Sequence, residues 1–263
     1  ALTGYPPGDL LLREDFLSKV ELFKRKIVSM TENTKTTLVL SIPEKKGDLY
    51  NSLILIKSGK IIERFFKKEL PNYGVFDEKR YFSTKENSKN LFYYKNKKIK
   101  FFICEDMWGT DQYQTKSESA DLIISINASP YEIGKDKLRK NLAKKKSKLL
   151  KSKLIYLNLI GSQDDLIFDG GSFVLNEKGE NIHQFKFFEE DEKIIDLQRT
   201  GMERVKIDDN QNLFNALKLS LASYVKRNNF NSIIIGLSGG VDSALCLAIA
   251  TNSLGAENVF PYF

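Results

Sequence analysis

Residues 232–243, SIIIGLSGGVDS, join a short apolar run to a glycine-rich turn, and residues 242–253 continue with a helical pattern. This order of strand, turn and helix is the repeating unit of open α/β sheets. It places backbone N–H groups and a helix N-terminus where they can hold an anion such as phosphate. Gly239 and Gly240 let the backbone approach that anion closely. The stretch therefore predicts an α/β fold with an anion site at the turn.

Polar side chains in the same turn suit a nucleotide and a cation. Asp242 supplies a carboxylate for a hard cation, and Ser243 supplies a hydroxyl for a phosphate oxygen. Neither a Walker loop nor a G-x-G-x-x-G fingerprint fits these residues. SGGVDS instead resembles the pyrophosphate loop of ATP-pyrophosphatases, although a tight turn that merely requires glycine is the alternative. The resemblance implies Mg²⁺ at Asp242 and ATP at Gly236, Leu237, Ser238, Gly239, Gly240, Val241, Asp242 and Ser243.

Upstream of this unit, residues 36–195 alternate short β-rich runs with turn signals and indicate a mixed α/β layer structure. We expect a helix over 212–226 and an amphipathic helix over 135–151, whose apolar side would be formed by Leu138, Leu142, Leu149 and Leu150. Strands are expected at 36–42 and 153–160, and hairpins at 52–56 with 60–66, 92–94 with 98–103, and 172–176 with 181–188.

The polar stretch 189–210 has weak periodicity and is interpreted as a linker. We therefore predict one domain over 1–190, a linker over 191–210, and the start of a second domain over 211–263. The sequence begins at Ala1 and ends just after the start of a strand, so we expect a fragment cut at both ends.

Composition narrows the class of protein. The 263 residues are 41% hydrophobic, and the net charge of +7 arises from lysines interspersed with acidic residues, which favours a solvated surface over a nucleic-acid face. Two cysteines and one histidine are too few for a disulfide framework or a structural zinc site. The apolar runs are too short to span a bilayer, and no signal peptide is recognisable. We expect a cytoplasmic protein without membrane or nucleic-acid partners.

Cys104 ends the strand-like run KIKFFIC and is followed at once by acidic residues. An inert buried cysteine is the usual interpretation of such a position. A nucleophilic cysteine would need a base, and because His183 lies far along the chain, a Cys/His pair is a poor candidate. A carboxylate base with a lysine as electrostatic partner remains as the reactive alternative.

Five strings distributed over the chain resemble the nitrilase-type glutaminase domain of the glutamine-dependent NAD synthetase family: ALTGYPPGDLLL from Ala1, LPNYGVFDEKRYF from Leu70, ICEDMW around Cys104, INASPYEIGK from Ile126 and GSQDDLIFDGGSFV from Gly161. The resemblance implies a nitrilase-like α-β-β-α sandwich, followed by the first strand, loop and helix of a Rossmann-like ATP-pyrophosphatase domain.

The resemblance also implies roles for single residues. Cys104 corresponds to the nucleophile and Lys67 to its lysine partner, with the neighbouring Lys68 as the alternative. Tyr73, Ser129 and Lys135 correspond to residues that hold glutamine, and Glu78 to a second carboxylate that orients the lysine. Ordinary turn residues or a surface charge are the alternatives for the glutamine contacts. The family's general-base glutamate would lie upstream of Ala1, outside this sequence.

The expected reaction is the amidation of deamido-NAD to NAD, with ATP, Mg²⁺ and ammonia released from glutamine. We expect glutamine, ATP and deamido-NAD as substrates, and a homo-oligomer. A stand-alone amidase of the nitrilase family would not need the SGGVDS unit, and a non-catalytic scaffold would not need a reactive Cys104. These remain the two alternatives.

Overall fold

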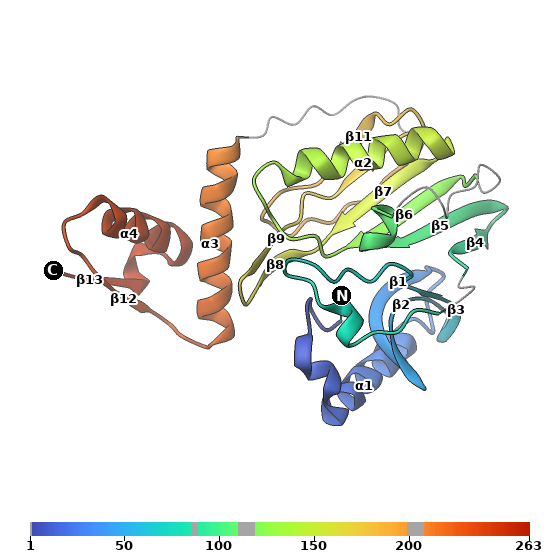
Figure 1. Ribbon diagram of the computed structural model, residues 1–263, viewed down its shortest axis with the longest axis horizontal. Coiled ribbons are helices and arrows are strands. Elements are labelled where there is room, and N and C mark those ends of the chain that lie inside the picture. The colour runs from blue at the N-terminus through green and yellow to red at the C-terminus, as the bar shows by residue number, and fades with distance from the viewer. Residues whose placement is uncertain (1, 86–88, 110–118, 199–207) are drawn as a thin grey trace.

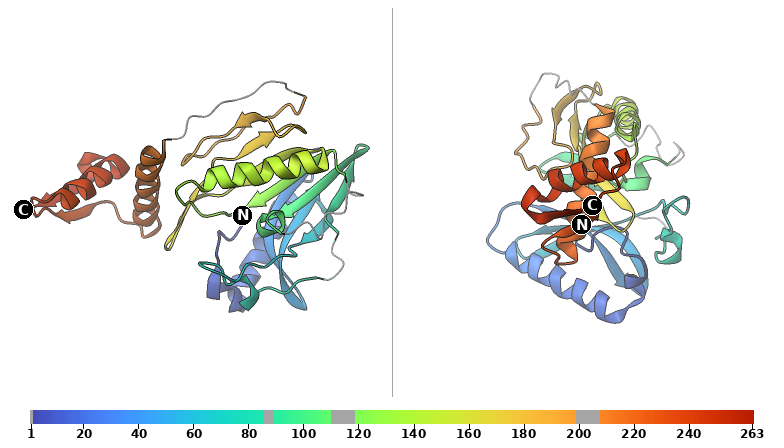
Figure 2. Two further views of the ribbon diagram at one scale, coloured as in Figure 1. Left: turned by 45° about the horizontal axis from the view of Figure 1, so that its top comes forward. Right: turned by 90° about the vertical axis from the view of Figure 1, so that its left-hand side faces the viewer.

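The computed structural model describes residues 2–85, 89–109, 119–198 and 208–263. Two β-sheets lie face to face, and a helix covers the outer side of each (Figure 1). A smaller unit of helices and two strands follows at the C-terminal end and projects away from the sheets (Figure 2).

The first sheet is antiparallel and has the order β1-β2-β3. Ser58 and Gly59 both have positive φ and form the tight turn between β2 and β3, as the sequence predicts. Alternate residues of β2 face opposite sides, because side chains alternate along a strand. The elements of this layer are α1 (Glu14–Met30), β1 (Leu38–Lys46), β2 (Asp48–Lys57) and β3 (Lys60–Phe66).

The second sheet has six strands in the order β11-β10-β7-β6-β5-β4. Its centre, β5-β6-β7, is parallel, and antiparallel strands flank it on both sides. Helix α2 (Lys135–Leu150) connects β6 to β7 and covers the outer face. The strands are β4 (Leu91–Tyr94), β5 (Lys97–Ile103), β6 (Leu122–Asn127), β7 (Lys153–Asn158), β10 (Phe173–Leu175) and β11 (Asn181–Gln184).

Separate apolar clusters hold the four layers together. Leu53 and Leu55 of β2 pack with Phe101 and Ile103 of β5 between the sheets. On the outer face of the first sheet, Ile54 and Ile56 pack with side chains of α1. On the outer face of the second sheet, Phe102 and Leu154 pack with Ala143 and Leu150 of α2. The predicted nitrilase-like α-β-β-α sandwich is confirmed.

The C-terminal unit contains α3 (Asp209–Arg227), β12 (Ile233–Gly236), α4 (Val241–Leu254) and β13 (Val259–Tyr262). Strands β12 and β13 are parallel, and α4 connects them, as expected for a strand, loop and helix of Rossmann type. The hairpin β8 (Ile160–Gln163) and β9 (Leu166–Asp169) reaches from the sandwich to α3.

Several expectations need correction. Helix α2 buries Arg139 and Lys146, whereas Leu138 and Leu149 of the predicted apolar side are exposed. The two buried cations have polar partners, the carboxylate of Asp169 for Arg139 and the carbonyl oxygen of Gly109 for Lys146. The strand predicted over 153–160 is divided after Asn158. The sequence analysis does not predict helix α1 or hairpin β8–β9.

Within the described residues, no helix has the length and apolar character needed to span a membrane.

Candidate functional site

Cys104 stands at the carboxyl end of β5, where η3 (Cys104–Met107) begins. Its backbone has φ +47°, in the left-handed region that non-glycine residues rarely adopt. Such strain persists only where surrounding contacts impose it, and it is common at functional positions. The fold therefore holds this cysteine in a specific, unfavourable conformation, which the interpretation as an inert core residue does not explain.

A pocket of about 250 Å³ opens over Cys104. The carboxyl ends of β5, β6 and β7 line one side of it, and residues within β1 and β2 line the other. The N-terminal segment Thr3–Tyr5 forms one wall. The residues of the lining that can bind or polarise a substrate include Lys67, Glu78, Ala128 and Asn158.

Lys67, just past the end of β3, is buried beside this pocket with Glu78 of η2 (Glu78–Arg80). The Lys67 ammonium donates to both carboxylate oxygens of Glu78, at 2.8 and 2.7 Å. The Tyr5 hydroxyl donates to Oε1 of the same carboxylate at 2.8 Å, and Asn51 donates to it at 3.4 Å. A buried ion pair with several hydrogen bonds fixes the ammonium in one place.

The charges around the thiol act in opposite directions. Burial raises the pKa of Cys104 above its ordinary value, and the Lys67 ammonium and a backbone hydrogen bond from Ala128 oppose that rise. Glu78 and Glu105 raise it further. The resting thiol is therefore protonated near neutral pH, and its attack on a substrate would require a base to accept the proton.

The three residues expected to hold glutamine lie in different surroundings. Most of the Tyr73 side chain is exposed, and its hydroxyl donates to Glu105 at 2.9 Å. Partial loss of water around the hydroxyl and this hydrogen bond raise the pKa of Tyr73 to about 12. Lys135 begins α2 and forms an ion pair with Glu132 at 3.0 Å. Ser129 is buried and is absent from the pocket lining.

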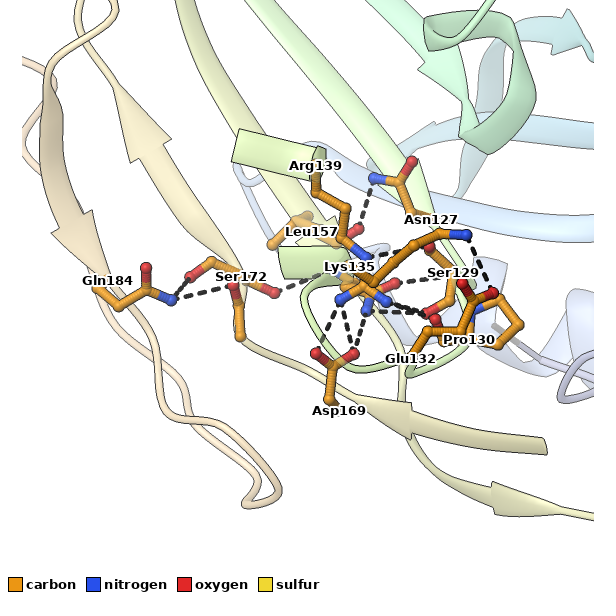
Figure 3. A network of polar contacts seen from close by, with 12 residues as sticks. Asn127, Ser129, Pro130, Glu132, Lys135, Arg139, Leu157, Asp169, Ser172 and Gln184 are labelled. Carbon is orange, nitrogen blue, oxygen red and sulfur yellow. Dashed lines mark hydrogen bonds and ion pairs between the residues drawn. The ribbon is translucent and has the colours of Figure 1, made fainter. Parts of the chain in front are cut away.

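Ser129 belongs to a polar network behind the pocket wall, centred on Arg139 of α2 (Figure 3). Arg139 donates to both oxygens of Asp169 at 2.7 and 2.8 Å, to Ser129 Oγ at 3.0 Å, and to the carbonyl oxygens of Ser129 and Pro130. The Asn158 side chain accepts from the Ser129 N–H at 2.9 Å. The network fixes the turn that follows β6 and carries Ala128.

We expect Arg139→Met to destabilise the fold by about 3–5 kcal/mol, because the substitution removes the cation that pairs with the buried Asp169 carboxylate. The longer bonds from Asn158, at 3.2 and 3.3 Å, then remain to Asp169 and to the Ser129 carbonyl. Urea-induced unfolding measures this loss. Arg139→Met/Asp169→Leu should recover part of it. Arg13→Met, which breaks the exposed pair with Asp15, should cost far less, because water screens an exposed ion pair. Equal losses from the two single variants would contradict a stabilising role for the buried network.

The glycine-rich turn lies in the C-terminal unit, between β12 and α4. Gly239 has φ +80° and an added Cβ would meet nothing, so backbone conformation requires the glycine there. Ser243 donates to the Gly240 carbonyl at 2.9 Å, and its hydroxyl lies 3.3 Å from that of Ser238. The Leu237 N–H donates to Tyr262 in β13 at 2.7 Å, which removes this N–H from the expected phosphate contacts.

Asp242 occupies the first turn of α4, directly beside this loop. The described ranges contain no group of three or more His, Cys, Asp or Glu side chains arranged around a metal ion. Mg²⁺ commonly binds one or two carboxylates together with substrate phosphates and water. One carboxylate at the start of a helix beside a glycine-rich turn fits that pattern.

The sequence does not predict Tyr5 or the Arg139–Asp169 pair as parts of this site. Tyr5 and Asp169 lie within the strings that carry the family resemblance. Their contacts cannot be predicted from the sequence, because Tyr5 and Glu78 are 73 positions apart and Arg139 and Asp169 are 30 positions apart.

Known proteins match both parts of the chain. The carbon-nitrogen hydrolase family profile matches residues 3–207, and the NAD synthase profile matches residues 213–262. The glutamine-dependent NAD(+) synthetase of Synechocystis sp. is 39% identical over 285 residues, which cover 98% of this chain and 51% of that protein. The chain spans about half the length of the curated relatives it matches.

Solved structures give the same picture. The glutamine-dependent NAD+ synthetase from Acinetobacter baumannii, in complex with ADP, superposes with a TM-score of 0.89 at 36% identity, covering 98% of this chain and 50% of that one. The carbon-nitrogen hydrolase from Helicobacter pylori G27 shares the fold at a TM-score of 0.59 and 20% identity, over 68% of this chain and 69% of that one. Because the hydrolase profile extends over most of its length, the chain belongs to the carbon-nitrogen hydrolase family.

Proposed function

We propose that the protein containing this chain is a glutamine-dependent NAD synthetase, which amidates deamido-NAD to NAD with ammonia taken from glutamine. One observation carries the proposal. A strained cysteine shares a pocket with a buried Lys67–Glu78 pair, and the same chain continues into a strand, a glycine-rich loop and a helix. A stand-alone amidase would use the first part and leave the second without a purpose.

In the proposed first reaction, the Cys104 sulfur attacks the side-chain amide carbon of glutamine. A base passes the thiol proton to the nitrogen, the C–N bond breaks, and ammonia leaves. Water then hydrolyses the thioester to glutamate and restores the thiol. The Lys67 ammonium and a backbone N–H would stabilise the oxyanion that forms during attack. Glu78 would orient Lys67, because both its oxygens accept from that ammonium, and this engagement makes it a poor proton acceptor for the thiol. The expected general-base glutamate lies outside residues 1–263 and stays a prediction.

Tyr73 and Lys135 are proposed contacts for the remainder of glutamine. Their polar groups are tied to the carboxylates of Glu105 and Glu132 and can exchange these partners for an amino acid. Ser129 is proposed to act at the same site, and Arg139 fixes its position. The opposite charges available in this region, from Lys135, Glu105 and Glu132, complement the carboxylate and ammonium of an amino acid substrate.

In the proposed second reaction, the loop from Gly236 to Ser243 holds ATP while the carboxylate of deamido-NAD attacks the α-phosphate and pyrophosphate leaves. Ammonia then displaces AMP from the adenylate. Mg²⁺ would be held by Asp242 and would neutralise charge on the phosphates. We propose that residues 1–190 release the ammonia, that 191–210 link the two parts, and that 211–263 open the ATP domain. A cytoplasmic homo-oligomer remains part of the proposal.

The proposal is tested by supplying the whole protein with ATP, deamido-NAD and glutamine, and by measuring glutamate, NAD and AMP. We expect one glutamate for each NAD formed. Lys67→Ala should abolish glutamate release, since it removes an oxyanion partner worth on the order of a hundred- to a thousandfold in rate. Lys68→Ala is the matched control and should have a mild effect, because Lys68 does not line the pocket. Glutamate release without ATP-dependent NAD formation would support an amidase instead.

A further inference from the structure

One carboxylate connects the two chain segments that carry Lys67 and Cys104. Asp106 Oδ1 accepts hydrogen bonds from the backbone N–H groups of Lys68 at 2.9 Å and Glu69 at 2.8 Å. Its Oδ2 accepts from the N–H of Ile103 at 3.2 Å. Lys68 and Glu69 follow Lys67 directly, and Ile103 precedes Cys104. The carboxylate therefore joins the end of β3 to the end of β5.

The same bonds act on the strained backbone of Cys104. A non-glycine residue is less stable in the left-handed region than in the right-handed one and needs surrounding contacts to hold it there. The bond from Ile103 to Asp106 closes the turn immediately around Cys104, with φ +47° inside it. Lys67 is held at two points: Glu78 binds its ammonium, and Asp106 binds the peptide groups that follow it.

We propose that Asp106 is a positioning residue that holds Cys104 in its left-handed conformation and keeps Lys67 at a fixed place opposite the sulfur. Asp106 is outside the pocket lining, so it acts through these two residues and not on the substrate. The inference rests on the proposed function of Cys104 as the nucleophile that attacks glutamine.

Asp106→Asn keeps the size of the side chain but replaces one acceptor oxygen by an amide that only donates. At least one of the three backbone N–H groups then loses its acceptor, and the connection between the two segments loosens.

Among the groups that lower the pKa of the Cys104 thiol, Lys67 has the largest effect, so its displacement leaves that pKa higher. The other titratable groups facing the thiol are Glu78, Glu105, Tyr5, Tyr73 and Tyr156.

The test uses the whole protein and a diazoketone analogue of glutamine, with adducts at Cys104 quantified by peptide mass spectrometry. The maximal labelling rate and the half-saturating concentration are measured across pH. For Asp106→Asn we expect a maximal rate lower by about a hundredfold, as for a misplacement on the order of 1 Å. The acidic limb of the pH profile should move to higher pH, while half-saturation changes little. An unfolded fraction lowers the amount of labelled protein and not the rate constant.

Asp208→Asn is the matched control. Asp208 also accepts from two backbone N–H groups, those of Asn210 and Gln211, but it caps α3 away from the pocket. Both bonds go to Oδ1, an oxygen that asparagine retains, so Asp208→Asn should change stability little and should leave the labelling rate and the pH profile unchanged. In a Lys67→Met background, Asp106→Asn should have a much smaller additional effect, because part of its action passes through Lys67.

An unchanged rate and pH profile in folded Asp106→Asn would overturn the inference, and so would the same change in Asp208→Asn. If Asp106→Asn does not fold, Asp106→Ser, which retains one short acceptor, takes its place under the same criteria. Wild-type protein that is not labelled at Cys104 would overturn the proposed function itself, and the inference with it.

Discussion

Cys104→Ala is expected to reduce glutamine-driven NAD synthesis by about a thousandfold or more while ammonia-driven synthesis by the same protein stays intact. Removal of a catalytic nucleophile commonly costs this much or more, since no other group can form the covalent intermediate. The glycine-rich loop lies in a separate unit, so the use of external ammonia does not require the thiol. Initial rates with glutamine and with an ammonium salt, at saturating ATP and deamido-NAD, provide the comparison.

The other cysteine serves as the control for this substitution. Cys246 is exposed on α4, and Cys246→Ala should leave the glutamine-driven rate near that of the wild type. If Cys104→Ala lowered both rates together, the thiol would have a structural role in the whole protein. If it lowered neither, the glutaminase site would lie elsewhere.

The sequence predicts the layers of the fold better than the faces of its helices. Ser58 and Gly59 specify the β2–β3 turn locally, because both residues adopt positive φ there. The turn of hairpin β8–β9 contains no glycine: it is formed by Asp164, which also has positive φ, and Asp165 within a polar run. Local chemistry therefore identifies one hairpin and leaves the other unrecognised.

Helix α2 shows why periodicity alone misplaces a buried face. Its leucines indicate an apolar side, yet Arg139 and Lys146 are buried while Leu138 is exposed. Arg139 can be buried only because Asp169 lies opposite it, and that partner comes from a strand 30 positions away. Long-range ion pairs of this kind leave no trace in a single sequence.

In the candidate site too, the sequence predicts which residues take part but not all of their contacts. Family strings point to Cys104, Lys67 and Glu78, and the fold brings these side chains into one pocket. The family resemblance points to Lys67 with Lys68 as the alternative, and no local feature of the sequence separates the two. The strain at Cys104 and the three backbone bonds of Asp106 depend on the ends of two strands meeting, which only the three-dimensional structure shows.

Asp242→Ala is expected to remove NAD synthesis from glutamine and from ammonia alike, with a loss of at least about a hundredfold. A carboxylate that holds Mg²⁺ on the phosphates accounts for several kcal/mol of charge stabilisation, and both nitrogen sources depend on the same adenylation. Basal hydrolysis of glutamine should partly survive, because Cys104 and its pocket belong to the sandwich. NAD formation and glutamate release are measured in parallel on the same preparation.

A first-turn aspartate also stabilises its helix, by about 0.3–1 kcal/mol, so the stability of α4 must be separated from the proposed binding of the cation. Asp209→Ala removes a first-turn carboxylate from α3 and leaves the glycine-rich loop unaltered. It should lose similar stability and retain synthesis from both nitrogen sources.

Asp242→Asn, which keeps the shape of the side chain and loses its charge, should resemble Asp242→Ala in activity. Undiminished ammonia-dependent synthesis in either Asp242 variant would show that SGGVDS is only a structural turn, because a loop that holds the magnesium and phosphates of ATP cannot lose its carboxylate without effect.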